Sequence, residues 1–228
     1  MTYDHPKFLT MGDRSLLVEL SAEISLEVNR RVRSLYYSLS HRKLNGIVEL
    51  LPSYTSLLIV FDPLVVSISA LRAVVTQMLD SPAEMRIPKP KTVEIPVVYG
   101  GDFGPDLDWV ADYHRLSPAE VVRHHSATVY HVYMIGFTPG YPYMGEVPGE
   151  IVTPRRGTPR THVPRGSVGI AQKQTGIYPV ESPGGWQIIG RTPLLLFDPY
   201  GTPPTLLETG DVVTFYPIKK EAFENWRQ

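Results

Sequence analysis

The stretch TPRRGTPRTHVPRGSVGIAQKQTGIYPVESPGGWQIIGRTP, from Thr153 to Pro193, decides how the second half of the chain folds. It holds three short β-prone runs, SVGIAQ, GIYPVE and GWQIIG, and glycine and proline recur between them. Its apolar residues do not follow the spacing of a helix face. Further β runs lie on both sides, from TVYHVYMIGF at 128–137 to DVVTFYP at 211–217. Many short strands joined by such turns predict a β-barrel or a β-sandwich.

The same stretch is strongly cationic. Between Ile151 and Arg191 the chain has one acidic side chain, Glu181, and six cationic ones: Arg155, Arg156, Arg160, Arg165, Lys173 and Arg191. The whole chain has a formal net charge of −1, so its overall balance indicates neither nucleic acid nor an anionic membrane as a partner. The planar fork of arginine suits carboxylates and phosphates. The cluster therefore either surrounds a small anion or consists of solvated loop residues.

Several classes of catalytic site are excluded by what the sequence lacks. There is no cysteine, hence no thiol nucleophile, thiolate metal site or disulfide. His124, His125 and His131 are separated by a predicted helix-to-strand break and have no carboxylate at ligand spacing, so no metal site is expected. Gln172 stands where a phosphate-binding P-loop requires glycine, and Ser167 lacks the first glycine of a nucleophile elbow.

Targeting signals are also missing from the sequence. The N-terminal segment MTYDHPKFLT has no apolar core, and this is not the pattern of a signal peptide. The longest apolar runs are too short to span a bilayer. We therefore expect a soluble, cytoplasmic protein without a membrane partner.

The first third of the chain alternates strands and helices. KFLTMGDRSLLVEL predicts two strands about a Gly12-Asp13 turn, and helical spacing follows over residues 21–40. GIVELLPSYTSLLIVFD predicts two more strands around Pro52-Ser53, and Ser67 is placed to cap a second helix. This order predicts a small ferredoxin-like α/β domain over residues 1–88, and an α+β protein overall.

A proline-rich connection separates this domain from the next. SPAEMRIPKPKTVEIP has proline at 82, 88, 90 and 96, a density that stops a helix and favours extended chain. The second domain is therefore expected over residues 89–228. It begins with a strand and two short helices over 104–127, with Ser117 as N-cap and Pro118 as the first helical residue of the second helix.

The segment GFTPGYPYMGEVP, from Gly136 to Pro148, is a second candidate site element. Its glycines permit tight turns, and its aromatic residues Phe137, Tyr141 and Tyr143 offer flat faces. The alternative is an ordered loop that packs its aromatic side chains on the barrel.

Three sets of motifs resemble one family. They are GFTPGYPYMGEVP, the stretch 153–193 and EIPVVYGGDFGPDL, with GDRSLLVEL and PSYTSLLIVFDP in the first domain. Together they are similar to the allophanate hydrolase subunit 1 family, which includes the B subunits of 5-oxoprolinase and the sporulation kinase inhibitor KipI. The resemblance implies a small α/β domain followed by a cyclophilin-like β-barrel. It also implies the B subunit of an ATP-dependent complex that opens 5-oxo-L-proline to L-glutamate, with A and C subunits as its partners.

The chemistry of the side chains then suggests their places in a shared site. No residue in the chain is a convincing nucleophile, so we expect a site completed by the C subunit and a chain that is inactive alone. ATP would be used by the complex and not through a P-loop in this chain. The expected anion contacts are Arg155, Arg160 and Arg191, with Gln174, Thr175 and Tyr178 lining the same groove. The expected walls are Gly184, Gly185, Trp186, Phe137 and Tyr141.

Alternatives remain open at this stage. A KipI-like chain would inhibit a histidine kinase through a surface, and a relative on the urea-degrading branch would serve a urea carboxylase or allophanate hydrolase system. Prolyl isomerase activity would rest on the barrel fold alone.

Overall fold

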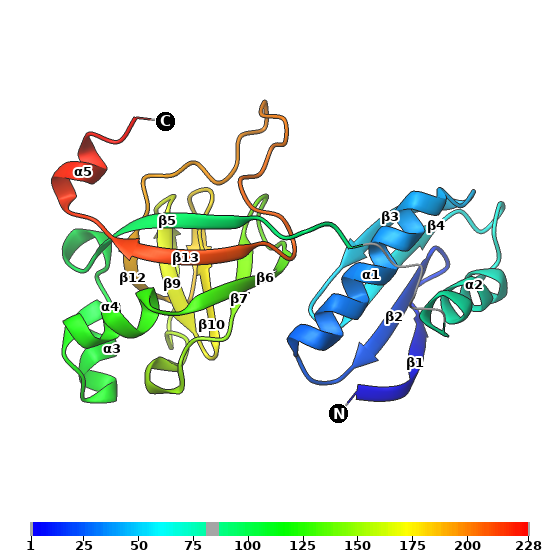
Figure 1. Ribbon diagram of the computed structural model, residues 1–228, viewed down its shortest axis with the longest axis horizontal. Coiled ribbons are helices and arrows are strands. Elements are labelled where there is room, and N and C mark those ends of the chain that lie inside the picture. Colours follow the sequence, from blue (N-terminus) through cyan, green and yellow to red (C-terminus); the bar gives the residue numbers. More distant parts are fainter. Residues whose placement is uncertain (1, 81–86, 228) are drawn as a thin grey trace. The chain divides into compact units, whose positions relative to one another are not determined.

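The structure is a computed structural model that describes residues 2–80 and 87–227 (Figure 1). The chain divides into two compact units, Met1–Lys89 and Pro90–Gln228, one residue from the expected boundary. Part of the proline-rich connection, residues 81–86, lies outside the described residues. No helix within the described ranges is long and apolar enough to cross a membrane.

The first unit is a four-stranded antiparallel sheet with two helices. Its elements are β1 (Thr2–Thr10), β2 (Ser15–Ser21), α1 (Leu26–Arg42), β3 (Ile47–Pro52), β4 (Ser56–Phe61) and α2 (Ile68–Asp80). The sheet order is β1-β2-β4-β3. In a ferredoxin-like domain, the last strand follows the second helix and lies at the sheet edge. Here the strand at that edge, next to β2, is instead β1, which comes first in the chain. The expected strand and helix pattern is confirmed.

The core of this unit lies between one sheet face and both helices. In β2 and β4 alternate residues are buried, such as Leu16 and Val18 in β2 and Ile59 in β4. The same apolar cluster includes Leu35 of α1 and Val75 of α2, so the two helices cover the same face. Both helices begin at a serine cap, because the hydroxyl of Ser25 accepts from the N–H of Val28 and that of Ser67 accepts from the N–H of Ala70.

The second unit is a closed barrel with peripheral helices. The barrel strands are β5 (Thr92–Tyr99), β6 (Val129–Ile135), β7 (Pro142–Gly145), β9 (Ser167–Ala171), β10 (Gln174–Ile177), β12 (Gln187–Arg191) and β13 (Val212–Pro217). They follow the order β10-β7-β6-β13-β5-β12-β9, and β9 pairs with β10 to close the barrel. Only β13 and β5 pair in parallel among these strands. The expected cyclophilin-like barrel is therefore present, built from seven strands.

Short elements surround this barrel. They are the single turns η2 (Gly101–Phe103) and η3 (Gly149–Ile151), the helices α3 (Leu107–His114), α4 (Pro118–Ser126) and α5 (Lys220–Glu224), and the strands β8 (Arg160–Val163) and β11 (Ser182–Gly184), which pair with each other. The cap expected for α4 is confirmed as a full capping box. The Ser117 N–H donates to the Glu120 carboxylate at 2.8 Å, and the Ser117 hydroxyl accepts from the Glu120 N–H at 3.3 Å.

Candidate functional site

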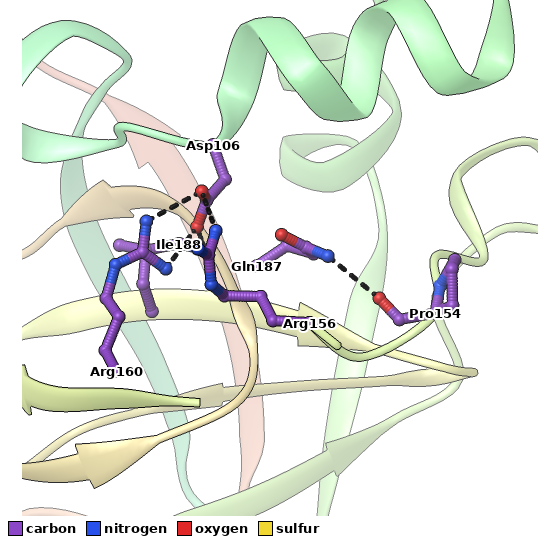
Figure 2. Close-up of polar contacts among 6 residues, drawn as sticks. All are labelled: Asp106, Pro154, Arg156, Arg160, Gln187 and Ile188. Atoms are coloured by element: carbon purple, nitrogen blue, oxygen red, sulfur yellow. Dashed lines mark hydrogen bonds and ion pairs between the residues drawn. The ribbon is translucent and has the colours of Figure 1, made fainter. Parts of the chain in front are cut away.

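Asp106 is the residue on which the arginine motif converges. Arg160 donates to both oxygens of its carboxylate, from Nη1 to Oδ2 at 2.8 Å and from Nη2 to Oδ1 at 2.7 Å. Arg156 donates from Nη1 to Oδ1 at 2.9 Å (Figure 2). The backbone N–H of Ile188 donates to Oδ2 at 2.7 Å. A bidentate fork combined with a backbone donor is a strong arrangement for an ion pair.

This carboxylate also fixes the start of α3 to the barrel. Asp106 is the N-cap of α3, but its side chain makes no cap hydrogen bond to that helix. Instead its backbone N–H donates to the carbonyl of Ile188 at 2.9 Å, so the same two residues are joined in both directions. The Asp106 side chain is only 6% exposed, whereas those of Arg156 and Arg160 are 33% and 24% exposed. Two cations share one carboxylate, and the pairing leaves an excess of positive charge at the surface.

A groove opens beside this network. One wall is the exposed face of α3, where Trp109 and Tyr113 lie one helical turn apart with stacked rings, centroids 5.3 Å apart and planes at 22°. The opposite side is the loop 154–157, and Gln187 of β12 forms part of the lining. We call this the α3 groove; it has a volume of about 310 Å³ and is lined by Trp109, Tyr113, Pro154, Arg155, Arg156, Gly157 and Gln187.

Two hydrogen bonds hold the loop side of the α3 groove. The side-chain amide of Gln187 donates from Nε2 to the carbonyl of Pro154 at 3.1 Å (Figure 2). The backbone N–H of Arg156 donates to the carbonyl of Gly185 at 2.8 Å. The loop is therefore tied to β12 and to the residue before Trp186, which makes its geometry a property of the barrel and not of the loop alone.

An aromatic cluster lies apart from the main core of the barrel, next to the α3 groove. It consists of Tyr141, Tyr143, Tyr178 and Trp186, with ring centroids 4.8 to 5.9 Å apart. Two glycines make room for it: a Cβ on Gly176 would come within 2.7 Å of the Tyr141 hydroxyl, and one on Gly184 would overlap the Tyr178 ring. Phe137 meets Tyr141 edge-on and is otherwise exposed.

Arg155 lies between the α3 groove and this cluster. Burial raises the pKa of the Tyr143 and Tyr178 phenols, and the positive charge of Arg155 acts in the opposite direction on both. Arg155 itself is exposed, and no carboxylate within the described residues pairs with it. It is a cation without a carboxylate partner among the described residues, on the loop side of a groove whose opposite side is aromatic.

A separate chain of hydrogen bonds runs through the barrel interior. His125 is fully buried; its Nδ1 lies 2.8 Å from the Tyr99 hydroxyl and its Nε2 lies 2.9 Å from Oγ1 of Thr175. Because the Thr175 hydroxyl donates to the carbonyl of Gly169, it must accept from His125, which assigns the proton to Nε2. Burial lowers the pKa of His125 to about 3, so the ring is neutral at ordinary pH.

The structure brings together part of the set expected from the sequence. Tyr141, Tyr178 and Trp186 lie in the aromatic cluster, Gly184 packs against its Tyr178 ring, Arg155 lies beside it, and Gly185 holds the neighbouring loop. Arg160 lies close by, but its guanidinium is engaged by Asp106 and is not a free anion contact.

Other expected members do not share this groove. Thr175 is wholly buried inside the barrel with His125, which corrects its assignment to a groove wall. Its strand neighbour Gln174, half-buried at the start of β10, is not part of the α3 groove lining. Arg191 lies at the far end of β12 from Gln187, where its Nε donates to the carbonyl of Arg165 at 2.7 Å. Burial lowers the pKa of Arg191, and the nearby charge of Arg165 adds to this effect.

Sequence reasoning missed the residues that organise the site. Asp106, Trp109, Tyr113 and Gln187 are not among the expected site residues. Trp109 and Tyr113 have a recognisable signal, since two large aromatic residues four apart on a short helix share one face. No comparable sequence signal marks Asp106 and Gln187, because the residues that they contact are distant in the sequence. Within the part of the chain that the structure describes, no group of three or more His, Asp and Glu side chains could hold a metal ion.

The fold and the groove together define a two-unit α+β protein whose seven-stranded closed barrel has a cation-lined surface groove. The chain belongs to the family described as carboxyltransferase domain, subdomain C and D, whose model matches residues 6–207. Among relatives, it is 40% identical to the B subunit of 5-oxoprolinase from Bacillus subtilis (strain 168) over 228 residues, which cover 96% of this chain and 95% of that protein. The resemblance inferred from the motifs is therefore confirmed.

Solved structures extend the comparison. The crystal structure of TTHA0988 matches with a TM-score of 0.80 and 34% identity over 90% of this chain. This chain spans only 40% of the TTHA0988 chain. The urea amidolyase of K. lactis matches with a TM-score of 0.77 over 96% of this chain and 15% of its own, at 24% identity, which establishes a shared fold. The same two-unit fold thus occurs both in chains of this length and as part of longer ones.

Proposed function

We propose that this chain is the B subunit of an ATP-dependent 5-oxoprolinase, in which it helps to open 5-oxo-L-proline to L-glutamate. The observation that carries the proposal is the 40% identity to the B subunit of a 5-oxoprolinase across 96% of this chain and 95% of the relative. Because the match covers nearly the full length of both proteins, the similarity concerns the whole architecture and not a single motif.

The site chemistry fits the role of one contributor to a shared site. The α3 groove offers a cation, an amide and two aromatic faces, which are binding groups. His125 is sealed inside the barrel with a pKa near 3, so it is a poor general base at neutral pH. An activated nucleophile or base would then come from a partner. We assign that part to a homologue of the C subunit, with the A subunit completing the enzyme.

ATP is expected to bind elsewhere in the complex. The α3 groove, at about 310 Å³, is at the small end of the roughly 300–1,000 Å³ typical of ligand pockets. Its lining has one glycine and no run of backbone donors at a helix N-terminus, so its residues suit a small acid better than a triphosphate chain. No step of the reaction is assigned to ATP on this chain.

Reconstitution tests the proposal. The chain is co-expressed with its candidate A and C subunits, and L-glutamate release from 5-oxo-L-proline is measured with and without ATP. We expect ATP-dependent release by the mixture of all three proteins, none by this chain alone, and co-elution of this chain with the C subunit in size-exclusion chromatography. Three folded proteins that release no glutamate would refute the proposal, and urea-dependent ATP hydrolysis would move the chain to the urea-degrading branch. Inhibition of a sporulation histidine kinase stays a separate prediction, measured by autophosphorylation.

A further inference from the structure

We propose that the α3 groove binds a small carboxylic acid that also has an N–H donor and a flat ring, that is, a cyclic amide acid. The choice of 5-oxo-L-proline as the probe rests on the proposed function. The groove lies entirely within the second unit, so the inference needs no particular placement of the two units.

The charge of the groove favours a carboxylate. Arg155 is exposed and lines the groove, and no carboxylate in the described parts of the chain pairs with it. Arg156 is only partly neutralised, because it shares the single carboxylate of Asp106 with Arg160. The acidic residues of α3, Asp108 and Asp112, are exposed but are not among the residues that line the groove. An anion entering the groove therefore meets uncompensated positive charge on its loop side.

The opposite wall favours a flat, weakly polar face. Trp109 and Tyr113 remain 46% and 54% exposed although they are large aromatic side chains. Their rings are stacked at 22°, so each ring covers part of one face of the other and leaves its outer face exposed. A five- or six-membered ring lying on such an exposed face would cover apolar area that is otherwise left in water.

Gln187 determines which hydrogen-bonding group the ligand needs. The carbonyl of Pro154 can only accept, so the side chain of Gln187 must turn its NH₂ group toward it. This fixes Oε1 on the other side, and Figure 2 shows the oxygen directed away from Pro154. Gln187 is almost wholly buried, so its orientation is held by packing as well as by the hydrogen bond. The groove thus presents a fixed acceptor, which a ligand satisfies with an N–H.

These three features lie on one small cavity and describe one kind of molecule. A carboxylate faces Arg155, a lactam N–H faces Oε1 of Gln187, and the ring lies against Trp109. A simple carboxylic acid would leave the acceptor of Gln187 without a partner, which is costly for a buried polar group. A neutral lactam would leave Arg155 with water alone.

Binding to the full chain, without partners, tests the inference. 5-Oxo-L-proline is titrated into ¹⁵N-labelled protein while the indole N–H signals of its three tryptophans are followed. We expect a saturable shift of the Trp109 signal and little change at the buried Trp186. Arg155→Ala should weaken binding by about 10- to 100-fold, the loss of a charge-assisted hydrogen bond. Arg165→Ala, a charge removal outside the groove, should leave binding unchanged.

Two ligand analogues test the chemistry without altering the protein. 2-Pyrrolidinone lacks the carboxylate, and the corresponding γ-lactone acid replaces the N–H by oxygen. Each should bind at least about tenfold more weakly than 5-oxo-L-proline, since each leaves one polar group of the groove unmatched. Equal binding of all three compounds, the absence of a saturable Trp109 shift, or equal effects of Arg155→Ala and Arg165→Ala would overturn the inference.

The same variants separate this inference from the proposed function. If the reconstituted enzyme releases glutamate and Arg155→Ala leaves its KM unchanged, the groove is not the substrate site and the inference fails while the function stands. If the chain binds 5-oxo-L-proline as described but no reconstituted mixture releases glutamate, the binding site stands and the enzymatic proposal fails.

Discussion

The buried histidine of the barrel predicts a specific loss of stability in mild acid. His125 is neutral in the folded state because burial lowers its pKa from the ordinary 6.5 to about 3. In the unfolded chain it titrates normally. Stability is therefore fully present above pH 6.5 and is lost as the pH falls toward 3, because only the unfolded state binds the proton. At about pH 5, some 1.5 units below the unfolded pKa, the loss is about 2 kcal/mol at roughly 1.4 kcal/mol per unit.

Urea denaturation followed by tryptophan fluorescence measures this loss. All three tryptophans, Trp109, Trp186 and Trp226, lie in the second unit, so the signal reports the barrel. His125→Gln keeps a donor and an acceptor but cannot be protonated. Between about pH 7.5 and 5 the wild type should lose about 2 kcal/mol more than this variant, whereas the exposed His162→Gln should follow the wild type.

Comparing the wild type with His125→Gln cancels the contributions of other groups that titrate in the same range, because these groups are present in both proteins. One such group is His114, whose pKa is also lowered by burial. If the wild type and His125→Gln lose the same free energy of unfolding over this range, His125 is not a buried neutral group and the hydrogen-bond chain to Tyr99 and Thr175 is wrongly described.

Three further predictions concern the fold. Asp106→Asn should lower the free energy of unfolding of the barrel by about 2–3 kcal/mol, less than for a fully buried ion pair because its arginine partners are partly exposed; an unchanged urea midpoint would show that the pairing is not structural. Gly176→Ala should cost about 1–3 kcal/mol, since the added methyl meets Tyr141, and a fluorescence melt with no shift would contradict the tight packing. Leu35→Ala should cost about 2–5 kcal/mol in the first unit, seen by circular dichroism, while the tryptophan transition of the barrel stays in place; a common shift of both transitions would show that the units unfold together.

The local elements of this protein can be predicted from short-range patterns. The serine caps at Ser67 and Ser117 follow from position alone, because a capping hydroxyl needs only the next turn of helix. The four strands of the first unit follow from β-prone runs that flank turn residues. The closed order of the barrel cannot be read in this way, since the parallel pairing of β13 with β5 joins segments more than a hundred residues apart.

The candidate site shows the same difference between what local sequence patterns predict and what long-range contacts decide. The sequence by itself determined that arginine is concentrated over 155–191 and that aromatic and glycine residues accompany it, since both are matters of composition. Only the tertiary structure decided what each side chain does. Asp106 neutralises Arg160 and leaves Arg155 exposed, although nothing in the spacing distinguishes the two arginines. Thr175 turns into the barrel because successive residues of a strand face opposite sides, and which side is inward depends on the closure of the sheet. An ion pair and a strand face are properties of distances in space, and the chain acquires them only when the barrel closes.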